Sequence, residues 1–220
     1  MIFDFHTHTF FSDGANSPIE LIRCADSYGY DCIAITDHAS YSNLDEVIKG
    51  AIKDCELAGK YWDIIAIPGV ELTNIPAKSI DGMARYARES GARIVVVHGE
   101  SVVEPVEAGT NSAAVNSRYI DILAHPGFIT VKEAKKAAEN NIFLEITHRT
   151  GHCLSNGHVV KTGCMAGAKF LINSDAHSHK DLYRTGQQKM VALAAGLDIA
   201  GTDEVFKKNN IELLKKLGYR

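Results

Sequence analysis

The sequence lacks several features that define common functional classes. It has no Cys-x-x-C pair, no apolar run of membrane-spanning length, and no glycine-rich dinucleotide or phosphate-binding loop. It also lacks an excess of basic residues, and its net charge of −4 disfavours a broad surface for nucleic acids or membranes. The N-terminal segment contains the acidic Asp4 and no basic region, so we do not expect a secretory signal.

The sequence has few cysteines, and their spacing does not suggest disulfide pairs. The five cysteines stand at positions 24, 32, 55, 153 and 164, an odd number that does not form a disulfide framework. Cys24, Cys32 and Cys55 lie in apolar surroundings, where reduced cysteines pack as small hydrophobic side chains. Reduced cysteines predict a cytoplasmic protein.

Short apolar segments rich in β-branched residues recur about every 22 to 32 residues, which is roughly one strand–helix unit. They predict strands at 1–5, 32–36, 64–68, 93–97, 120–124, 142–146 and 169–173. Helical patterns lie between and after them, at 17–29, 44–59, 80–91, 130–141, 180–196 and 202–217. Strands that alternate with helices form parallel sheets. We therefore predict an α/β fold, a seven-stranded TIM-like barrel with a single domain over residues 1–220, in preference to an open sheet.

Polar side chains follow the end of nearly every predicted strand. His6 and His8 alternate onto one face of an extended chain, and the Ser12-Asp13-Gly14 turn can bring a carboxylate back over them. In a parallel barrel, all these strand ends surround one mouth. The candidate metal ligands there are His6, His8, Asp13, His38, Glu71, His98, His125, Asp175 and His177.

Each of these residues also has a structural explanation. A single histidine at a strand end can be a hydrogen-bonded rim residue, and an aspartate there can cap the next helix. Nine such groups at one mouth are too many for that explanation, because buried polar groups without partners cost several kcal/mol in total. Histidine and carboxylate without cysteine favour Zn, Mn or Fe. We predict two or three divalent ions, with Glu71 as a bridge.

The chain resembles the PHP (polymerase and histidinol phosphatase) superfamily of metal-dependent phosphoesterases, in particular its histidinol-phosphatase-like branch. The motifs that carry the resemblance are His6-Thr7-His8, Ser12-Asp13-Gly14, Thr36-Asp37-His38, Gly69-Val70-Glu71, His125-Pro126-Gly127 and Ser174-Asp175-Ala176-His177, with His98 at the remaining ligand position. The resemblance implies a distorted (β/α)7 barrel and a trinuclear site. It implies one ion at His6, His8, Glu71 and Asp175, a second at Glu71, His98 and His125, and a third at Asp13, His38 and His177.

The activity implied by the resemblance is hydrolysis of small phosphate esters, with histidinol phosphate as the expected substrate. Clustered divalent ions lower the pKa of bound water and align the attacking and leaving oxygens, so we expect a metal-bound hydroxide to attack phosphorus. Besides Glu71, we assign catalytic roles to Asp175 and His177, either of which, or a metal-bound water, could protonate the leaving alcohol. For substrate contact we predict Arg149 first, then His148, Arg118 and Arg184.

Three other functions compete with this one. An amidohydrolase also begins with His-x-His, but that class typically has a lysine where this chain has His98. The second is a PHP-type nuclease or nucleotide phosphatase acting on nucleotides or nucleic-acid ends. A nuclease would favour a basic groove, so nucleic acid is disfavoured while nucleotides stay open as substrates. The third competitor is a non-catalytic metal-binding module. The sequence favours no particular oligomeric state and predicts no membrane partner.

Overall fold

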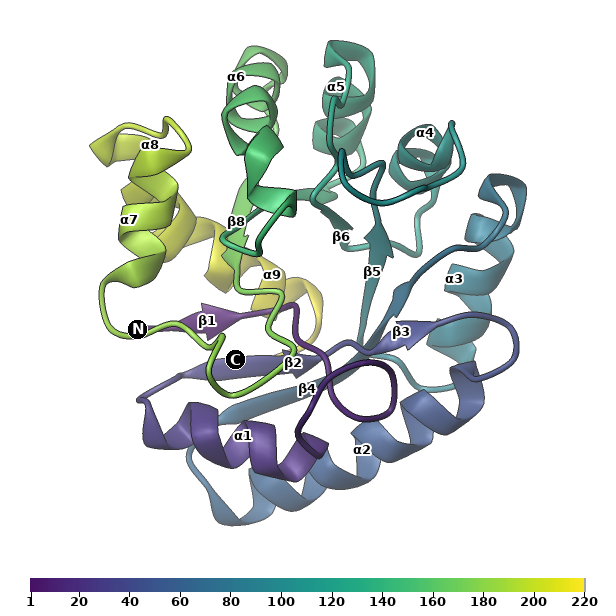
Figure 1. Cartoon of the computed structure of the whole chain (residues 1–220), viewed down its shortest axis with the longest axis vertical. Helices are drawn as coiled ribbons and strands as arrows, with labels where there is room; N and C mark the ends of the chain where they lie inside the picture. Colours follow the sequence, from purple (N-terminus) through teal and green to yellow (C-terminus); the bar gives the residue numbers. More distant parts are fainter. Residues whose placement is uncertain (220) are drawn as a thin grey trace.

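One parallel sheet curves almost into a closed barrel in the computed structural model of the chain, which describes residues 1–219 (Figure 1). The strands lie in the order β1-β2-β4-β5-β6-β7-β8, and the short β3 pairs with β4. Their bounds are β1 (Phe3–Asp4), β2 (Cys32–Ile35), β3 (His38–Ala39), β4 (Ile65–Leu72), β5 (Ile94–His98), β6 (Ile122–Ala124), β7 (Phe143–Thr147) and β8 (Phe170–Asn173). All pairings are parallel, which confirms the predicted seven-stranded barrel.

Four helices lie close to their predicted ranges: α1 (Pro18–Ser27), α2 (Leu44–Tyr61), α3 (Ile80–Glu89) and α5 (Val131–Glu139). Their starts follow from local sequence. The Ser17 hydroxyl accepts a hydrogen bond from the backbone N–H of Glu20 at the start of α1, and Thr130 and Glu133 form a reciprocal capping box on α5. These caps satisfy backbone N–H groups that have no partner within the helix.

The predictions were wrong elsewhere. The helices α4 (Thr110–Asn116) and α6 (Asn156–Ala166) were not predicted, and the helix expected at 180–196 is only α7 (Gln187–Ala194). Gly157 and Gly163 weaken the helical signal of α6, and a left-handed Gly186 (φ +85°) starts α7 late. The last predicted helix divides into α8 (Ile199–Glu204), the π-helical η3 (Val205–Asn209) and α9 (Asn210–Lys216). Two short 3-10 turns, η1 (Ala77–Ser79) and η2 (His152–Ser155), complete the elements.

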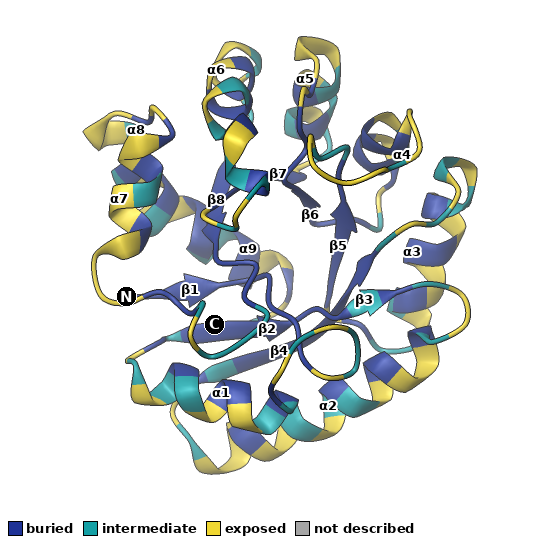
Figure 2. Ribbon diagram, in the orientation of Figure 1, coloured by how far each residue is buried: buried dark blue, intermediate teal, exposed yellow. Residues whose placement is uncertain are grey.

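The strands are buried on both faces, as their continuous apolar composition requires (Figure 2). Inside the barrel, side chains such as Phe5, Ile67 and Phe143 form one core, and α9 adds Leu213 and Leu214 to it. A second, larger core fills the space between the strands and the outer helices. No helix within residues 1–219 is both long and apolar enough to cross a membrane.

Candidate metal centre

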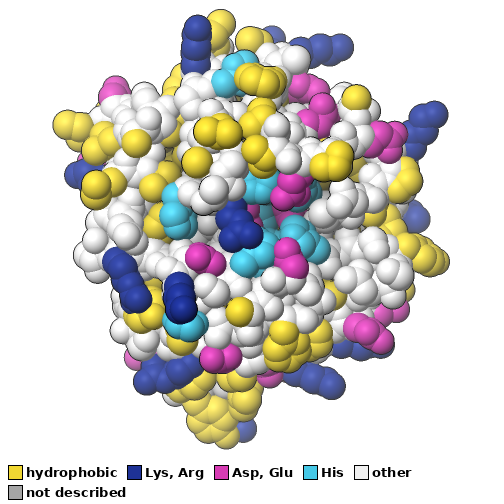
Figure 3. All heavy atoms as spheres, viewed as in Figure 1, with side chains coloured by type: hydrophobic (Ala, Val, Ile, Leu, Met, Phe, Trp, Pro, Cys, Tyr) yellow, Lys and Arg dark blue, Asp and Glu magenta, His cyan; other side chains and the backbone are white. Residues whose placement is uncertain are grey.

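The carboxyl ends of the strands surround a mouth in which histidine and acidic side chains gather (Figure 3). All nine predicted ligands lie in this cluster. The structure brings the candidate ligand atoms within 4.8 Å of one another in four overlapping groups: His8, Asp13, His38 and His177; His98, His125 and His152; His6, Glu71 and His125; and His6, His8 and Asp175. The barrel therefore assembles at one place residues that are up to 171 positions apart in the chain, from His6 to His177.

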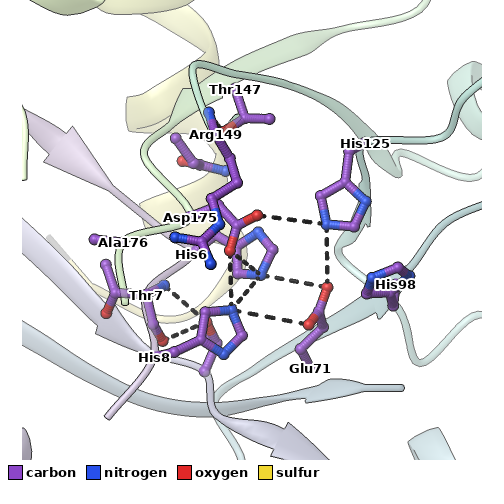
Figure 4. A network of polar contacts seen from close by, with 12 residues as sticks. His6, Thr7, His8, Glu71, His98, His125, Thr147, Arg149, Asp175 and Ala176 are labelled. Carbon is purple, nitrogen blue, oxygen red and sulfur yellow. Dashed lines mark hydrogen bonds and ion pairs between the residues drawn. The ribbon is translucent and has the colours of Figure 1, made fainter. Parts of the chain in front are cut away.

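The seam between β1 and β8 explains why the first and last motifs meet. Thr7 forms a parallel bridge with Ala176, and the backbone N–H of His8 donates to the Ala176 carbonyl at 2.8 Å. Side chains alternate along each strand, so the neighbours of Thr7 point to the same side as the neighbours of Ala176. His8 Nε2 consequently lies 3.1 Å from Asp175 Oδ1 and 3.0 Å from His6 Nε2 (Figure 4).

Glu71 lies inside β4, not beyond its end, because β4 continues to Leu72. The short β3 places His38 directly beside it, as the register pairs His38 with Glu71. The Glu71 carboxylate is fully buried and central: Oε2 lies 2.6 Å from His38 Nδ1, while Oε1 lies 3.3 Å from His6 Nε2 and 3.6 Å from His125 Nε2. This central position is the geometry that a bridging carboxylate needs.

Backbone strain accompanies two of these residues. His125 has φ +26° and Asp175 has φ +55°, in the left-handed region that residues other than glycine rarely occupy. The strain is held by surrounding hydrogen bonds, since His125 N–H donates to Glu145 Oε2 and Asp175 N–H donates to the His6 carbonyl. Strained backbone of this kind concentrates at functional sites, where it directs side chains toward a ligand.

The hydrogen-bond partners of the histidines leave nitrogen lone pairs directed into the cluster. His6 Nδ1–H donates to the Glu145 carboxylate at 2.7 Å, and His98 Nδ1–H donates to the Gly99 carbonyl at 3.0 Å, which assigns the lone pair to Nε2 in each neutral ring. Glu71 Oε1, His8 Nδ1 and His125 Nδ1 are buried without any hydrogen-bond partner. Inward lone pairs beside an unpartnered carboxylate oxygen fit divalent cations.

Burial and mutual charge shift the pKa values of the cluster in opposite directions. Burial raises the pKa of Asp175 to about 7. Burial also opposes ionisation of Glu71, but attraction to the protonated forms of His6, His38 and His98 outweighs it and holds the Glu71 pKa well below its usual range. Burial and the neighbouring His38 hold the pKa of His8 well below its usual value, so His8 is neutral and able to donate a lone pair.

Comparison with known proteins places this cluster in a family. The PHP domain matches residues 4–216. The chain belongs to the PHP family. The predicted class, a PHP-type metal-dependent phosphoesterase, is thereby confirmed, and all six motifs of the resemblance lie within the matched range.

Three relatives with similar sequences show the range of identity and coverage. An uncharacterized protein of Methanocaldococcus jannaschii is 50% identical over 99% of this chain and 100% of its own length. A probable phosphatase of Shewanella halifaxensis is 31% identical over 79% of this chain and 76% of its own length. The DNA polymerase/3'-5' exonuclease PolX of Bacillus subtilis is 26% identical over 80% of this chain, which spans 34% of that longer protein.

The fold also matches solved structures. YwqE from Bacillus subtilis and CpsB from Streptococcus pneumoniae are described as metal-dependent tyrosine phosphatases, and the match to their structures has a TM-score of 0.59. It covers 96% of this chain and 94% of the other at 15% sequence identity. At that identity the likeness shows the fold alone.

Only one of the four predicted substrate-binding residues of this PHP chain reaches the cluster. Arg149 follows β7, and its side chain extends into the mouth beside Asp175 (Figure 4). His148 packs instead against the buried Tyr183, with ring centroids 4.5 Å apart. Sequence proximity to a strand end therefore did not decide the direction of these two adjacent side chains.

The remaining two arginines lie away from the mouth. Arg118 precedes β6, so it lies near the amino ends of the strands, where it hydrogen-bonds the Tyr119 hydroxyl. The Arg184 guanidinium stacks on Tyr28 at the carboxyl end of α1, 3.3 Å from the ring centroid. We correct both predictions: neither arginine lies where it could contact a phosphate at the cluster.

Sequence reasoning missed several residues that support the cluster. Glu145, in the middle of β7, is fully buried and receives hydrogen bonds from His6, His125 and Asn173. A lone carboxylate within an apolar strand was the available signal. Asp37, predicted only as part of a motif, accepts bonds from Thr9 and Ser12 and so orders the loop that carries Asp13. His152, which is not among the nine predicted ligands, lies in the group with His98 and His125.

Proposed function

We propose that this PHP chain hydrolyses small phosphate monoesters, and that the nine predicted side chains at the barrel mouth hold two or three divalent cations for the reaction. The observation that carries the proposal is the arrangement around Glu71. Its carboxylate faces His6, His38 and His125 at 2.6 to 3.6 Å, with one oxygen unpartnered. When bound, divalent cations supply charge neutralisation and a water of lowered pKa.

The residues of the chain supply binding and orientation. Arg149 brings a guanidinium to the cluster beside Asp175, where it could contact a phosphoryl group (Figure 4). A guanidinium donates two parallel hydrogen bonds to phosphate oxygens, and this geometry holds the ester in one orientation. Because the surrounding carboxylates repel anions, Arg149 is the side chain on which substrate affinity depends.

Proton delivery to the leaving alcohol is assigned to the space beside His177. Its side chain is 14% exposed, against 3% for Asp175, so it reaches the open side of the cluster. His177 Nδ1–H donates to the Asp175 carbonyl at 3.0 Å, and Nε2 lies 3.1 Å from Asp13 Oδ2. Nε2 is therefore the nitrogen that His177 would give to a cation, and a water that His177 and Asp13 would hold there through that cation could protonate the leaving alcohol.

The size of the mouth favours a small substrate. A cavity of about 340 Å³ opens beside Asp13 and His38 and extends to Asn43, Thr73 and Glu104. That volume lies at the low end of ligand pockets. Its polar lining and the absence of an adjoining basic groove among residues 1–219 favour a small polar ester, such as histidinol phosphate or a nucleotide, over a nucleic-acid strand.

The test compares metal-free and reconstituted protein on p-nitrophenyl phosphate, histidinol phosphate, nucleoside monophosphates and a short oligonucleotide, with metal content measured on the same samples. Metal-dependent release of phosphate from the monoesters supports the proposal. Preferred cleavage of the oligonucleotide would support a PHP-type nuclease instead, in line with the PolX match. Tight cation binding without turnover on any substrate would support a non-catalytic metal-binding module.

A further inference from the structure

Two side chains outside the nine predicted ligands enclose the space beside His98 and His125. Glu104 comes from the irregular segment between β5 and α4, and His152 begins η2 after β7. The two carboxylate oxygens of Glu104 face two histidines: Oε2 lies 2.8 Å from His98 Nε2, and Oε1 lies 3.4 Å from His152 Nε2. The His152 ring stacks on His125 with centroids 4.0 Å apart.

The contact between His98 and Glu104 requires a positive centre. His98 Nδ1–H already donates to the Gly99 carbonyl, which can only accept, so the neutral ring directs an Nε2 lone pair at the Glu104 carboxylate. A lone pair and a carboxylate oxygen 2.8 Å apart repel each other unless a proton or a cation lies with them. A proton would satisfy this one pair, whereas a cation would satisfy all the groups that converge there.

The neighbouring histidines make the cation the better explanation. One ring nitrogen each from His98, His125 and His152 lie within 4.8 Å of one another, and all three residues are buried. Three imidazoles packed together without a shared ligand would repel when charged and leave lone pairs unsatisfied when neutral. The Ser101 hydroxyl, 2.6 Å from His152 Nδ1, fixes the His152 ring with Nε2 toward Glu104, as hydrogen bonds behind metal-binding histidines commonly do.

We propose that Glu104 and His152 are metal ligands, and that together with His98 and His125 they bind one of the divalent cations of this centre. Three neutral imidazoles and one carboxylate form a four-ligand set suited to Zn²⁺ or Fe²⁺. Glu71 then serves the adjoining cation together with His6, whose Nε2 lies 3.3 Å from Glu71 Oε1. This inference rests on the proposed metal centre, but not on the identity of the substrate.

The position of Glu104 gives this ligand set a particular property. Its side chain is 48% exposed and belongs to a segment without helix or strand, whereas the three histidines are buried on the barrel. The same carboxylate also lines the 340 Å³ cavity beside Asp13 and His38. Glu104 is therefore the ligand through which the surface segment at 99–109 is attached to the cation.

The test measures cation binding and does not depend on turnover. Metal-free full-length protein is titrated with Zn²⁺ by calorimetry, bound metal is counted by elemental analysis after dialysis, and Co²⁺ is substituted so that its visible spectrum reports the ligand set. The variants are Glu104→Gln and His152→Ala, singly and together. Glu107→Gln is the matched control, because Glu107 is an exposed glutamate of the same segment, and its carboxylate accepts a hydrogen bond from the Ala77 backbone N–H, away from the histidines.

Each single variant is expected to weaken binding of one cation by at least about tenfold, leave the other cations in place and change the Co²⁺ spectrum. The double variant should weaken binding of that same cation further than either single variant and still leave the other cations in place, because both side chains serve one site. Glu107→Gln should match the unmodified chain. Unchanged affinity and spectrum in both single variants would overturn the proposal. Unmodified protein that binds cations but hydrolyses nothing would overturn the proposed function alone.

Discussion

Substitution of Glu145 is the sharpest test of how the fold orients the histidines for metal binding. Its Oε1 accepts hydrogen bonds from His6 Nδ1 at 2.7 Å and Asn173 Nδ2 at 2.9 Å, and Oε2 accepts one from the His125 backbone N–H at 3.2 Å. Glutamine has the same shape but only one acceptor oxygen. In Glu145→Gln, the amide oxygen can take the place of Oε1 and keep the bonds from His6 and Asn173. The amide N–H₂ then takes the place of Oε2 and faces the His125 backbone N–H, so two donors oppose each other.

The expected magnitude follows from this mismatch. A buried donor left unsatisfied costs about 1–3 kcal/mol of unfolding free energy. Loss of the carboxylate behind a metal-binding histidine lowers cation affinity about 10- to 100-fold, equivalent to about 1.4–2.8 kcal/mol. We therefore expect Glu145→Gln to unfold at lower denaturant concentration and to bind Zn²⁺ at least tenfold more weakly. Denaturant titration and calorimetry on metal-free protein measure the two effects separately.

Glu139→Gln is the matched control, because Glu139 is an exposed glutamate at the end of α5. It should leave both quantities unchanged. If Glu145→Gln loses stability yet binds Zn²⁺ as tightly as the unmodified chain, Glu145 holds the strands together without orienting His6. If both the stability and the Zn²⁺ affinity are unchanged, Glu145 does not need two acceptor oxygens, and the reasoning above is refuted.

Four further predictions concern other parts of the site. Glu71→Ala should weaken binding of more than one cation and reduce kcat/KM by more than about 100-fold; near-normal turnover would contradict its bridging role. Arg149→Met should raise KM for p-nitrophenyl phosphate about tenfold or more with metal content unchanged, and Arg149→Lys should recover part of the loss; a loss of bound metal would count against a substrate role. Gly127→Ala should lower the free energy of unfolding by about 1–3 kcal/mol in thermal denaturation, because φ is +56° and the new Cβ would lie 1.9 Å from the Glu100 carbonyl oxygen; an unchanged Tm would show that the loop adjusts freely. Burial lowers the pKa of His38, but Glu71 and Asp13 outweigh it and raise that pKa to about 10; a cation must displace this proton, so affinity should rise with pH from about 6 to 8 in calorimetry, and a flat profile would contradict the assignment.

Local pattern was sufficient for much of the architecture. The strand that ends before His125 and the cap at Thr130 follow from neighbouring residues, since alternation, capping and apolar runs act over a few positions. The nine candidate ligands were found for the same reason: each stands near the end of a recognisable strand. Helix α6 was missed because its glycines weaken the local signal on which such predictions depend.

The local sequence pattern could not predict the direction in which individual side chains point. Arg118 and Arg149 both stand near strand ends in the sequence, yet only Arg149 follows the carboxyl end of its strand and enters the mouth. Glu104 has no periodic context at all, and its contact with His98 depends on how an irregular segment folds back over the barrel. Such contacts depend on the packing of the whole chain.

By itself, the sequence determined which chemistry this protein has: imidazoles and carboxylates at the ends of parallel strands, in the order shared by the PHP family. The tertiary structure alone decided how those groups are combined. The bridge of Thr7 with Ala176 unites the first and last motifs, and the pairing of His38 with Glu71 unites the middle ones. The physical reason is that residue type is local, whereas register between strands is set by closure of the barrel, and a shift of one residue would turn each ligand to the opposite face.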